Sequence, residues 1–386
     1  MAEQGDYLEF FGVERALFVN KELVGGDLNR FVDREQILEY FRAALLGGNT
    51  CAVVGKQGTG KSSFLLKLID EMKDSIYCDY LQFSFPPGDI EKSRLKFLRA
   101  ILRSILNLIL GNDELFNIYD KDEITFETKR LEYSITFEEH AKSLKSITSE
   151  ADGGIKSDIL NLMLPVEFKA KLDTSRSKEE ETIETKDYPI HNETTLYDTI
   201  VTISRKFNEP IVLFIDELDK VGRFPLESPE WDKEVVKILE LSREIMANEK
   251  IIMVFSLQHE LYEKLIRAKR GEGDISIMGL INIFKRLNGF DLKFAKDAVK
   301  KSLEVAGYKK TMEDLIEKGV IEIVLSVVKG NPRLFMTYLI EMSINAFLSK
   351  QKTITLDILK HYLLDLFEGM GEKEWTELVS KAAYLY

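Results

Sequence analysis

The stretch Cys51–Ser63 reads CAVVGKQGTGKSS and sets three glycines and a lysine between an apolar run and an amphipathic segment. Its spacing Gly55-x-x-x-x-Gly60-Lys61-Ser62 fits the phosphate-binding pattern G-x-x-x-x-G-K-[ST]. Such glycines let backbone N–H groups turn inward around an anion, and the following helix adds its positive N-terminal end. We expect Lys61 to reach the outer phosphates of a nucleotide and Ser62 to ligate Mg²⁺.

The alternative is a glycine-rich turn that joins a strand to a helix without binding anything. The flanking sequence favours the phosphate loop, because Thr50–Val54 has the pattern of a buried strand and Ser63–Met72 that of an amphipathic helix. The candidate nucleotide-binding residues of the loop are Gly55, Lys56, Gln57, Gly58, Thr59, Gly60, Lys61, Ser62 and Ser63.

The composition limits which classes of protein this chain can belong to. A chain of 386 residues with 45% hydrophobic content can bury a large core in two or three domains. The net charge of −12 argues against nonspecific coating of nucleic acid, although a local basic face stays open. Two cysteines, both in or beside expected strands, make a disulfide framework or a zinc site an unfavourable interpretation. With neither a signal sequence nor 18 successive apolar residues, we expect a cytoplasmic location and no membrane contact.

A second motif, IVLFIDE, ends in Asp216 and Glu217. Its five apolar residues suit a strand buried on both faces, and ligands of open α/β sheets bind at the carboxyl ends of strands. We expect Asp216 to organise Mg²⁺ and Glu217 to orient or deprotonate the attacking water. An acidic helix cap after a strand is the alternative, and the phosphate loop in the same chain disfavours it.

The remaining elements follow from periodicity. We expect a helix from Asp33 to Gly47-Gly48, strands at Tyr77–Phe85 and Ile251–Ser256, helices at Glu91–Leu110 and His191–Phe207, and a last core strand in FDLKF, residues 290–294. Residues 112–190 differ in character: LEYSITF (131–137) and VEFKAKL (166–172) alternate as strands do, beside acidic stretches with the pattern of solvated surface. From Asp297 onward the sequence is helical in pattern.

At these motifs the chain resembles the AAA+ and STAND-like branch of P-loop ATPases, which carry an extra strand and a catalytic glutamate. The resemblance covers residues 30 to about 350 and implies an α/β P-loop NTPase core with a parallel sheet flanked by helices (1–290) and an α-helical lid domain (291–386). Residues 112–190 stand outside it, and their alternating stretches predict a β-containing insertion in the core. FVDREQIL resembles the element that borders the adenine, which implies roles for Asp33, where the family has glycine, and Arg34. GNPRLF resembles the lid segment in which Arg333 would sense the γ-phosphate and Pro332 would contact the base.

The same resemblance implies a polar residue near the attacking water after the next strand, either Ser256 or Gln258. It also implies an arginine supplied by a neighbouring subunit. Arg286 is the candidate, Arg267 and Arg270 are competitors, and an ordinary surface arginine is an equal alternative. The lysines at 293, 296, 300 and 301 could contact DNA phosphates but favour a solvated helix face.

These observations predict an ATPase whose cofactors are ATP and Mg²⁺ and whose hydrolysis drives a conformational switch or assembly. The partner is a second copy of the chain or another protein, because the segment after QKTITLD is short for an appended DNA-binding domain. Two alternatives stay open: an ATP-dependent DNA-binding initiator or target selector, and a nucleotide-binding scaffold that never hydrolyses ATP.

Overall fold

The computed structural model describes residues 4–32, 34–83, 90–132, 134–135, 192–218, 229–247, 250–267, 281–367 and 371–383. Two compact units make up the chain: Met1–Ser93 with Phe207–Tyr386, and Arg94–Lys206. The expected domains 1–290 and 291–386 stay predictions.

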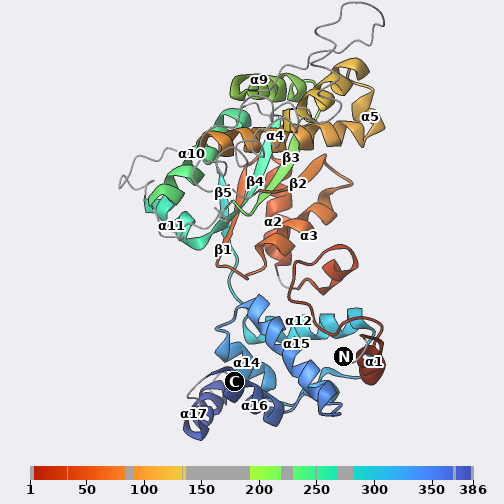
Figure 1. Cartoon of the computed structure of the whole chain (residues 1–386), viewed down its shortest axis with the longest axis vertical. Coiled ribbons are helices and arrows are strands. Elements are labelled where there is room, and N and C mark those ends of the chain that lie inside the picture. Colours follow the sequence, from red (N-terminus) through yellow and green to blue (C-terminus); the bar gives the residue numbers. More distant parts are fainter. Residues whose placement is uncertain are drawn as a thin grey trace, which may run out of the picture. The chain divides into compact units, whose positions relative to one another are not determined.

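A five-stranded parallel sheet with the order β2-β3-β4-β1-β5 is the centre of the first unit (Figure 1). Its strands are β1 (Cys51–Gly55), β2 (Cys78–Gln82), β3 (Ile211–Asp216), β4 (Ile251–Gln258) and β5 (Ile283–Arg286). The three inner strands are buried at every position, as expected for strands with neighbours on both sides and helices on both faces. Because all strands are parallel, the loop after β1 and the acids after β3 lie at the same edge of the sheet.

The α/β class and four of the five expected core strands are confirmed, with shifts of a few residues at their ends. The strand expected at 290–294 is wrong: the last strand is β5, and α12 (Leu292–Ala306) begins inside that stretch. The reason is local, since the Asp291 carboxylate accepts a hydrogen bond from the Phe294 N–H at 2.9 Å and caps the helix.

Helices cover both faces of the sheet. On one face α2 (Glu35–Leu46) and α3 (Lys61–Met72) pack Phe41, Phe64 and Leu68 against Val53 and Phe214. On the other, α10 (Pro229–Met246) and α11 (His259–Arg267) contact β4 and lie away from α2 and α3 in Figure 1. The expected helix at Asp33 begins instead at Glu35, with Arg34 as its N-cap and no side-chain cap; Asp33 itself lies outside the described residues.

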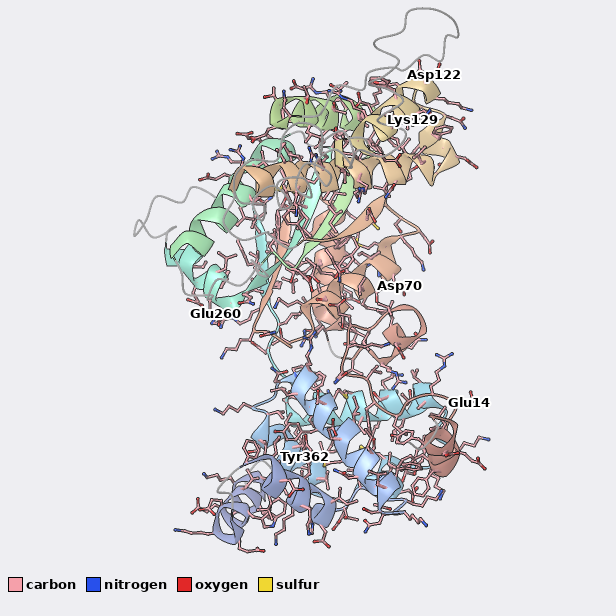
Figure 2. All side chains as sticks on the ribbon, viewed as in Figure 1. Glu14, Asp70, Asp122, Lys129, Glu260 and Tyr362 are labelled. Carbon is pink, nitrogen blue, oxygen red and sulfur yellow. The ribbon has the colours of Figure 1, made fainter. Side chains whose placement is uncertain are left out.

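The C-terminal part of the first unit is helical, as predicted. After α12 come α13 (Met312–Leu315), α14 (Val320–Val327), α15 (Pro332–Leu348), α16 (Leu356–Leu366) and α17 (Glu372–Ala383). Gly307 ends α12 at φ 78, and Asn331 caps α15 with proline in its first turn. In this part Tyr362, labelled in Figure 2, packs edge-on against Tyr338 with ring centroids 5.3 Å apart.

The N-terminal residues join this helical core. The short helix α1 (Gln4–Phe11) and the segment after it contribute Phe11, Val13, Leu17 and Phe18 to the same buried cluster as α12–α17. The backbone N–H of Glu14, a residue labelled in Figure 2, donates to the Ala306 carbonyl at 2.8 Å. Near the phosphate loop the 3-10 helix η1 (Gly25–Arg30) contacts α3 and α12.

The second unit is helical where it is described. Its elements are α4 (Ile90–Leu110, which begins in the first unit), α5 (Asp113–Phe116), helical residues 121–132 and 134–135, and α9 (Glu193–Ser204). The strand expected at 131–137 is therefore wrong at 131–132 and 134–135. The buried residues Ile124, Leu131 and Ser134 follow the spacing i, i+7 and i+10, which is typical of one face of a helix. The alternation in LEYSITF is too short to distinguish this pattern from a strand. The strand expected at 166–172 lies outside the described residues.

Candidate functional site

The loop between β1 and α3 has the glycine conformations expected of an anion-binding loop. Gly58 and Gly60 adopt φ of 80 and 86, a left-handed conformation that glycine accepts readily. A Cβ on Gly55 would stand 2.4 Å from Thr59 Oγ1, so that position also requires glycine. Thr59 Oγ1 donates to the Lys56 carbonyl at 2.8 Å and closes the turn. The loop thus directs the first N–H groups of α3 toward its hollow.

Lys61 is folded into this loop. Its side chain is buried, and Nζ donates to the Gly55 carbonyl at 3.1 Å and to the Lys56 carbonyl at 3.4 Å. Ser62 and Ser63 follow in the first turn of α3, and Ser63 Oγ accepts from the Leu23 N–H at 3.2 Å. A positive charge and the hydroxyl of Ser62 therefore lie at the N-terminal end of α3.

The acidic pair lies at the end of β3. The Asp216 carboxylate is 2% exposed and is held from two sides: Oδ1 accepts from the Glu217 N–H at 2.8 Å, and Oδ2 accepts from the Tyr80 hydroxyl at 2.6 Å. Burial first, and then the charge of Asp216, raise the pKa of Tyr80 well above its usual range, so this hydroxyl remains a donor. Tyr80 is a contact that sequence reasoning missed.

Glu217 adopts φ 65, an unfavourable conformation for a residue with a side chain. Such strain concentrates at functional sites, where the surrounding structure enforces it. The turn takes the chain out of β3 directly after Asp216.

The two polar candidates on β4 occupy different places. Gln258 lines the cavity described below, whereas Ser256 is not among its described lining residues. Ser256 lies opposite Val53 in the sheet, is fully buried, and its Oγ has no hydrogen-bond partner within the described part of the chain. Position thus favours Gln258 for contact with a ligand, and the role of either residue stays a prediction.

One cavity brings most of the expected site residues together. Its lining comes from the phosphate loop, the ends of β3 and β4, the start of α15 and the N-terminal segment. The predicted residues in its wall are Arg34, Gln57, Gly58, Thr59, Gly60, Lys61, Ser62, Ser63, Asp216, Glu217, Gln258, Pro332 and Arg333. Gly55 and Lys56 lie in the adjoining loop and strand. Asp33 is outside the described residues.

The lid segment GNPRLF contacts the phosphate loop directly. Asn331 Nδ2 donates to the Gln57 carbonyl at 3.0 Å, and the Arg333 N–H donates to the Gly58 carbonyl at 3.2 Å. The Arg333 side chain is exposed at the cavity, and Pro332 is buried in its wall. The helical part therefore contributes side chains to the same cavity as the phosphate loop.

A segment to which the sequence analysis gave no role, residues 19–30, supplies a further part of the wall, and Phe290, Ala298, Ser302 and Met336 line it as well. It is hydrogen-bonded to β2 and to α15: Glu22 accepts from Gln82 Nε2 at 3.3 Å, and Asn20 Nδ2 donates to Thr337 on α15 at 3.2 Å. Arg34, shortly after this segment, is buried and donates to the Asn288 carbonyl at 2.9 Å. Arg34 was predicted from FVDREQIL, whereas the sequence of residues 19–30 gave no signal that they line a cavity.

The candidate arginine fingers are not in the cavity wall as far as the structure describes them. Arg286 ends β5, where Nη2 contacts Glu263 Oε1 at 2.8 Å and His259 Nδ1 at 3.2 Å. The side chain of Arg267 and all of Arg270 lie outside the described residues.

Two of the lysines considered for DNA have acidic partners within the chain. Lys296 pairs with Glu322 at 2.8 Å, and Lys301 pairs with Glu304 at 2.9 Å.

No helix in the described ranges is both long and apolar enough to cross a lipid bilayer.

The fold and the site together define a class. A phosphate loop after β1, an acidic pair after β3 and an additional strand between them are the features of a P-loop NTPase core with the extra strand, as the sequence predicted. The sequence matches the KAP family P-loop domain over residues 48–277, more than half of the chain, and the protein belongs to this family.

Comparison with curated proteins found no match. Solved structures with similar folds include the Orc1 protein of Aeropyrum pernix in complex with DNA, at 7% identity and TM-score 0.48, with 91% of this chain and 71% of that chain covered. The Walker-type ATPase PABY2304 of Pyrococcus abyssi is 11% identical at TM-score 0.45, with 96% and 81% covered. The RuvB branch migration motor of Thermotoga maritima is 11% identical at TM-score 0.39, with 90% and 76% covered.

Proposed function

We propose that this protein binds and hydrolyses ATP with Mg²⁺ and uses the cycle to change how its helical lid contacts the phosphate loop. The observation that carries the proposal is the cavity that joins Lys61 and Ser62 to Asp216 and Glu217, with Arg333 at its rim. The hydroxyl and carboxylate oxygens of Ser62 and Asp216 are the hard ligands that suit Mg²⁺. Bound Mg²⁺ would neutralise charge on the phosphates.

Each residue has a distinct role in this proposal. Lys61 releases its loop carbonyls and binds the outer phosphates beside the loop N–H groups. Glu217 accepts a proton from the attacking water or orients it, and Gln258 hydrogen-bonds the same water. Arg333 stabilises negative charge on the terminal phosphate.

Coupling to a partner follows from the lid contacts. Arg333 makes no ion pair with the described residues, and a terminal phosphate in the cavity would give it an anionic partner, so hydrolysis removes one attraction between lid and loop. We propose that the resulting change is read by a second copy of the chain or by another protein. Internal pairing of Lys296 and Lys301 supports this target over DNA.

The test is phosphate release from wild type, Lys61→Ala and Glu217→Gln. We expect release to fall about 100- to 10,000-fold in Glu217→Gln, the usual contribution of a general base. Lys73→Ala and Glu260→Gln are the matched controls on the surfaces of α3 and α11, and both should match wild type. Background release from all proteins, wild type included, would instead support a nucleotide-binding scaffold.

The downstream target needs a separate experiment. Light scattering after size exclusion, with ATP and with ADP, should show an ATP-dependent change in oligomeric state or in complex formation with a partner. A mobility shift of duplex DNA that weakens steeply with salt and requires ATP would contradict the protein-partner proposal and favour the DNA-binding alternative.

A further inference from the structure

Tyr80 lies on the edge strand β2, and its hydroxyl reaches the carboxylate of Asp216. Its partner in the sheet is Phe214, two residues before Asp216, and it packs against the core cluster under α2 and α3. Its hydroxyl is 2.6 Å from Asp216 Oδ2. Tyr80 is not among the described residues that line the cavity, so it acts on Asp216 without a place beside the ligand.

The Asp216 carboxylate is held at both oxygens. The Glu217 N–H holds Oδ1 and the Tyr80 hydroxyl holds Oδ2, so rotation of the carboxylate breaks at least one hydrogen bond. Each carboxylate oxygen has a second lone pair, which leaves an acceptor site for a metal ion or its water. The two donors therefore fix the direction in which the remaining lone pairs point.

The surroundings make Tyr80 the side-chain donor in this arrangement. Asp216 is 2% exposed, so bulk water does not replace a lost donor easily. The other acid near Tyr80, Glu22, accepts from Gln82 and thus has a hydrogen bond of its own. Second-shell hydrogen bonds of this kind orient metal-ligating side chains and tune metal affinity.

We propose that Tyr80 is a positioning residue for Asp216 and sets the affinity of the nucleotide site for its divalent cation. This inference rests on the proposed Mg²⁺–ATP site but adds a residue from a strand that carries none of the nucleotide-binding motifs. The hydroxyl takes no part in bond making or breaking.

The experiment measures metal binding rather than turnover. Mn²⁺, used as a paramagnetic probe, is titrated into protein saturated with a non-hydrolysable ATP analogue, and free Mn²⁺ is followed by electron paramagnetic resonance. We expect Tyr80→Phe to weaken Mn²⁺ binding about 10- to 100-fold, the usual effect of losing an outer-shell partner. Binding of the analogue without metal should stay unchanged.

Tyr119→Phe is the matched control, since the Tyr119 hydroxyl is also a buried donor, to the Ile203 carbonyl at 2.8 Å, far from these motifs in sequence. It should bind Mn²⁺ as wild type does. Tyr80→His, which keeps a ring N–H donor, is the second variant and should recover part of the affinity lost in Tyr80→Phe. It also keeps the test decisive if Tyr80→Phe does not fold.

Three outcomes would overturn the inference. Equal Mn²⁺ affinity in wild type, Tyr80→Phe and Tyr80→His shows that the hydroxyl does not position Asp216. An equal loss of metal-free analogue binding assigns Tyr80 to the nucleotide or to the fold. Failure of wild type to bind the analogue with Mn²⁺ rejects the proposed function itself, and the inference with it, which distinguishes that failure from the first.

Discussion

Glu217 combines a strained backbone with a reactive side chain. Its φ of 65 is a conformation that costs a residue with a Cβ about 1–2 kcal/mol, and glycine avoids this cost. The structure retains glutamate there, directly after the buried Asp216. We propose that the chemistry of the carboxylate, rather than stability, explains glutamate at this position.

This strain gives a prediction that separates backbone from side chain. Glu217→Ala and Glu217→Gly both lose the carboxylate, so the difference between them reports the backbone alone. We expect the glycine variant to be more stable by about 0.5–1 kcal/mol, after the entropy cost of glycine is subtracted. Urea unfolding of the two variants measures this difference in the free energy of unfolding. At the helical control position Glu341 on α15 the order should reverse, with glycine less stable by about 1 kcal/mol; the same order at both sites would refute the strain.

The two thiols give a prediction about pH. Burial raises the pKa of Cys51 to about 12, and burial followed by the charge of Asp79 raises the pKa of Cys78 to about 11. At pH 8 about one Cys78 thiol in 1,000 is then ionised, and fewer at Cys51, so iodoacetamide should label native protein far more slowly than urea-unfolded protein. Each thiol stays protonated to a higher pH in the folded state than in the unfolded state. The free energy of unfolding should therefore fall as pH rises above about 9. Mass spectrometry measures the labelling rate, and labelling of the native protein as fast as that of the unfolded protein would contradict the prediction.

At the scale of elements, the connection from β5 to α12 lies directly against the residues before α15. Gly289 in the first segment and Gly330 in the second make this close contact. The Phe290 N–H donates to the Gly330 carbonyl at 2.7 Å, and a Cβ on Gly289 would stand 2.5 Å from that same carbonyl oxygen. Close backbone approach here places Asn331 against the phosphate loop. The lid contact therefore depends on these elements meeting without side chains between them.

Gly330→Ala tests this approach against a matched glycine. Gly330 and Gly48 have φ of 73 and 75, so alanine costs about 1–2 kcal/mol at either for its left-handed backbone. A Cβ at Gly330 also stands 2.7 Å from the Phe290 carbonyl oxygen, whereas a Cβ at Gly48 meets nothing within 4 Å. We expect Gly330→Ala to lose about 1–3 kcal/mol more in urea unfolding, the usual cost of overpacking. Equal losses would show that the backbones separate freely.

Two incorrect element predictions share a physical cause. In FDLKF and in LEYSITF a few alternating apolar residues fit a strand, but over so short a run the same residues fit one face of a helix. The Asp291 cap decided the first, and burial of Ile124 with Leu131 decided the second. The longer periodic stretches of α2, α3 and the helical region from Asp297 onward were predictable because several turns of one face must agree.

At the scale of the whole molecule, the ends of the first unit fold together. Phe11, Leu17 and Phe18 share a buried cluster with residues of α12–α17, although more than 270 positions separate them from α12. The segment that follows them lines the nucleotide cavity. The N-terminal residues are thus part of the helical core and of the site.

Leu17→Ala tests this arrangement. Leu17 is fully buried, so we expect a loss of about 2–5 kcal/mol in the free energy of unfolding of the full chain. Leu348→Ala removes the same atoms from a side chain that is 67% exposed and should change stability by less than about 0.5 kcal/mol. Equal, small losses would show that the N-terminal segment folds independently of the helices.

The sequence by itself determined the parts whose physics is local: the glycines and Lys61 of the phosphate loop and the apolar run before Asp216. The conformation of a turn depends on residues that are adjacent in the sequence, so it can be predicted from the sequence alone. Only the tertiary structure decided which distant groups share the cavity, because sheet order and packing are set by the whole core. It alone brought Tyr80 to Asp216, Asn331 to Gln57 and the N-terminal segment to the cavity wall.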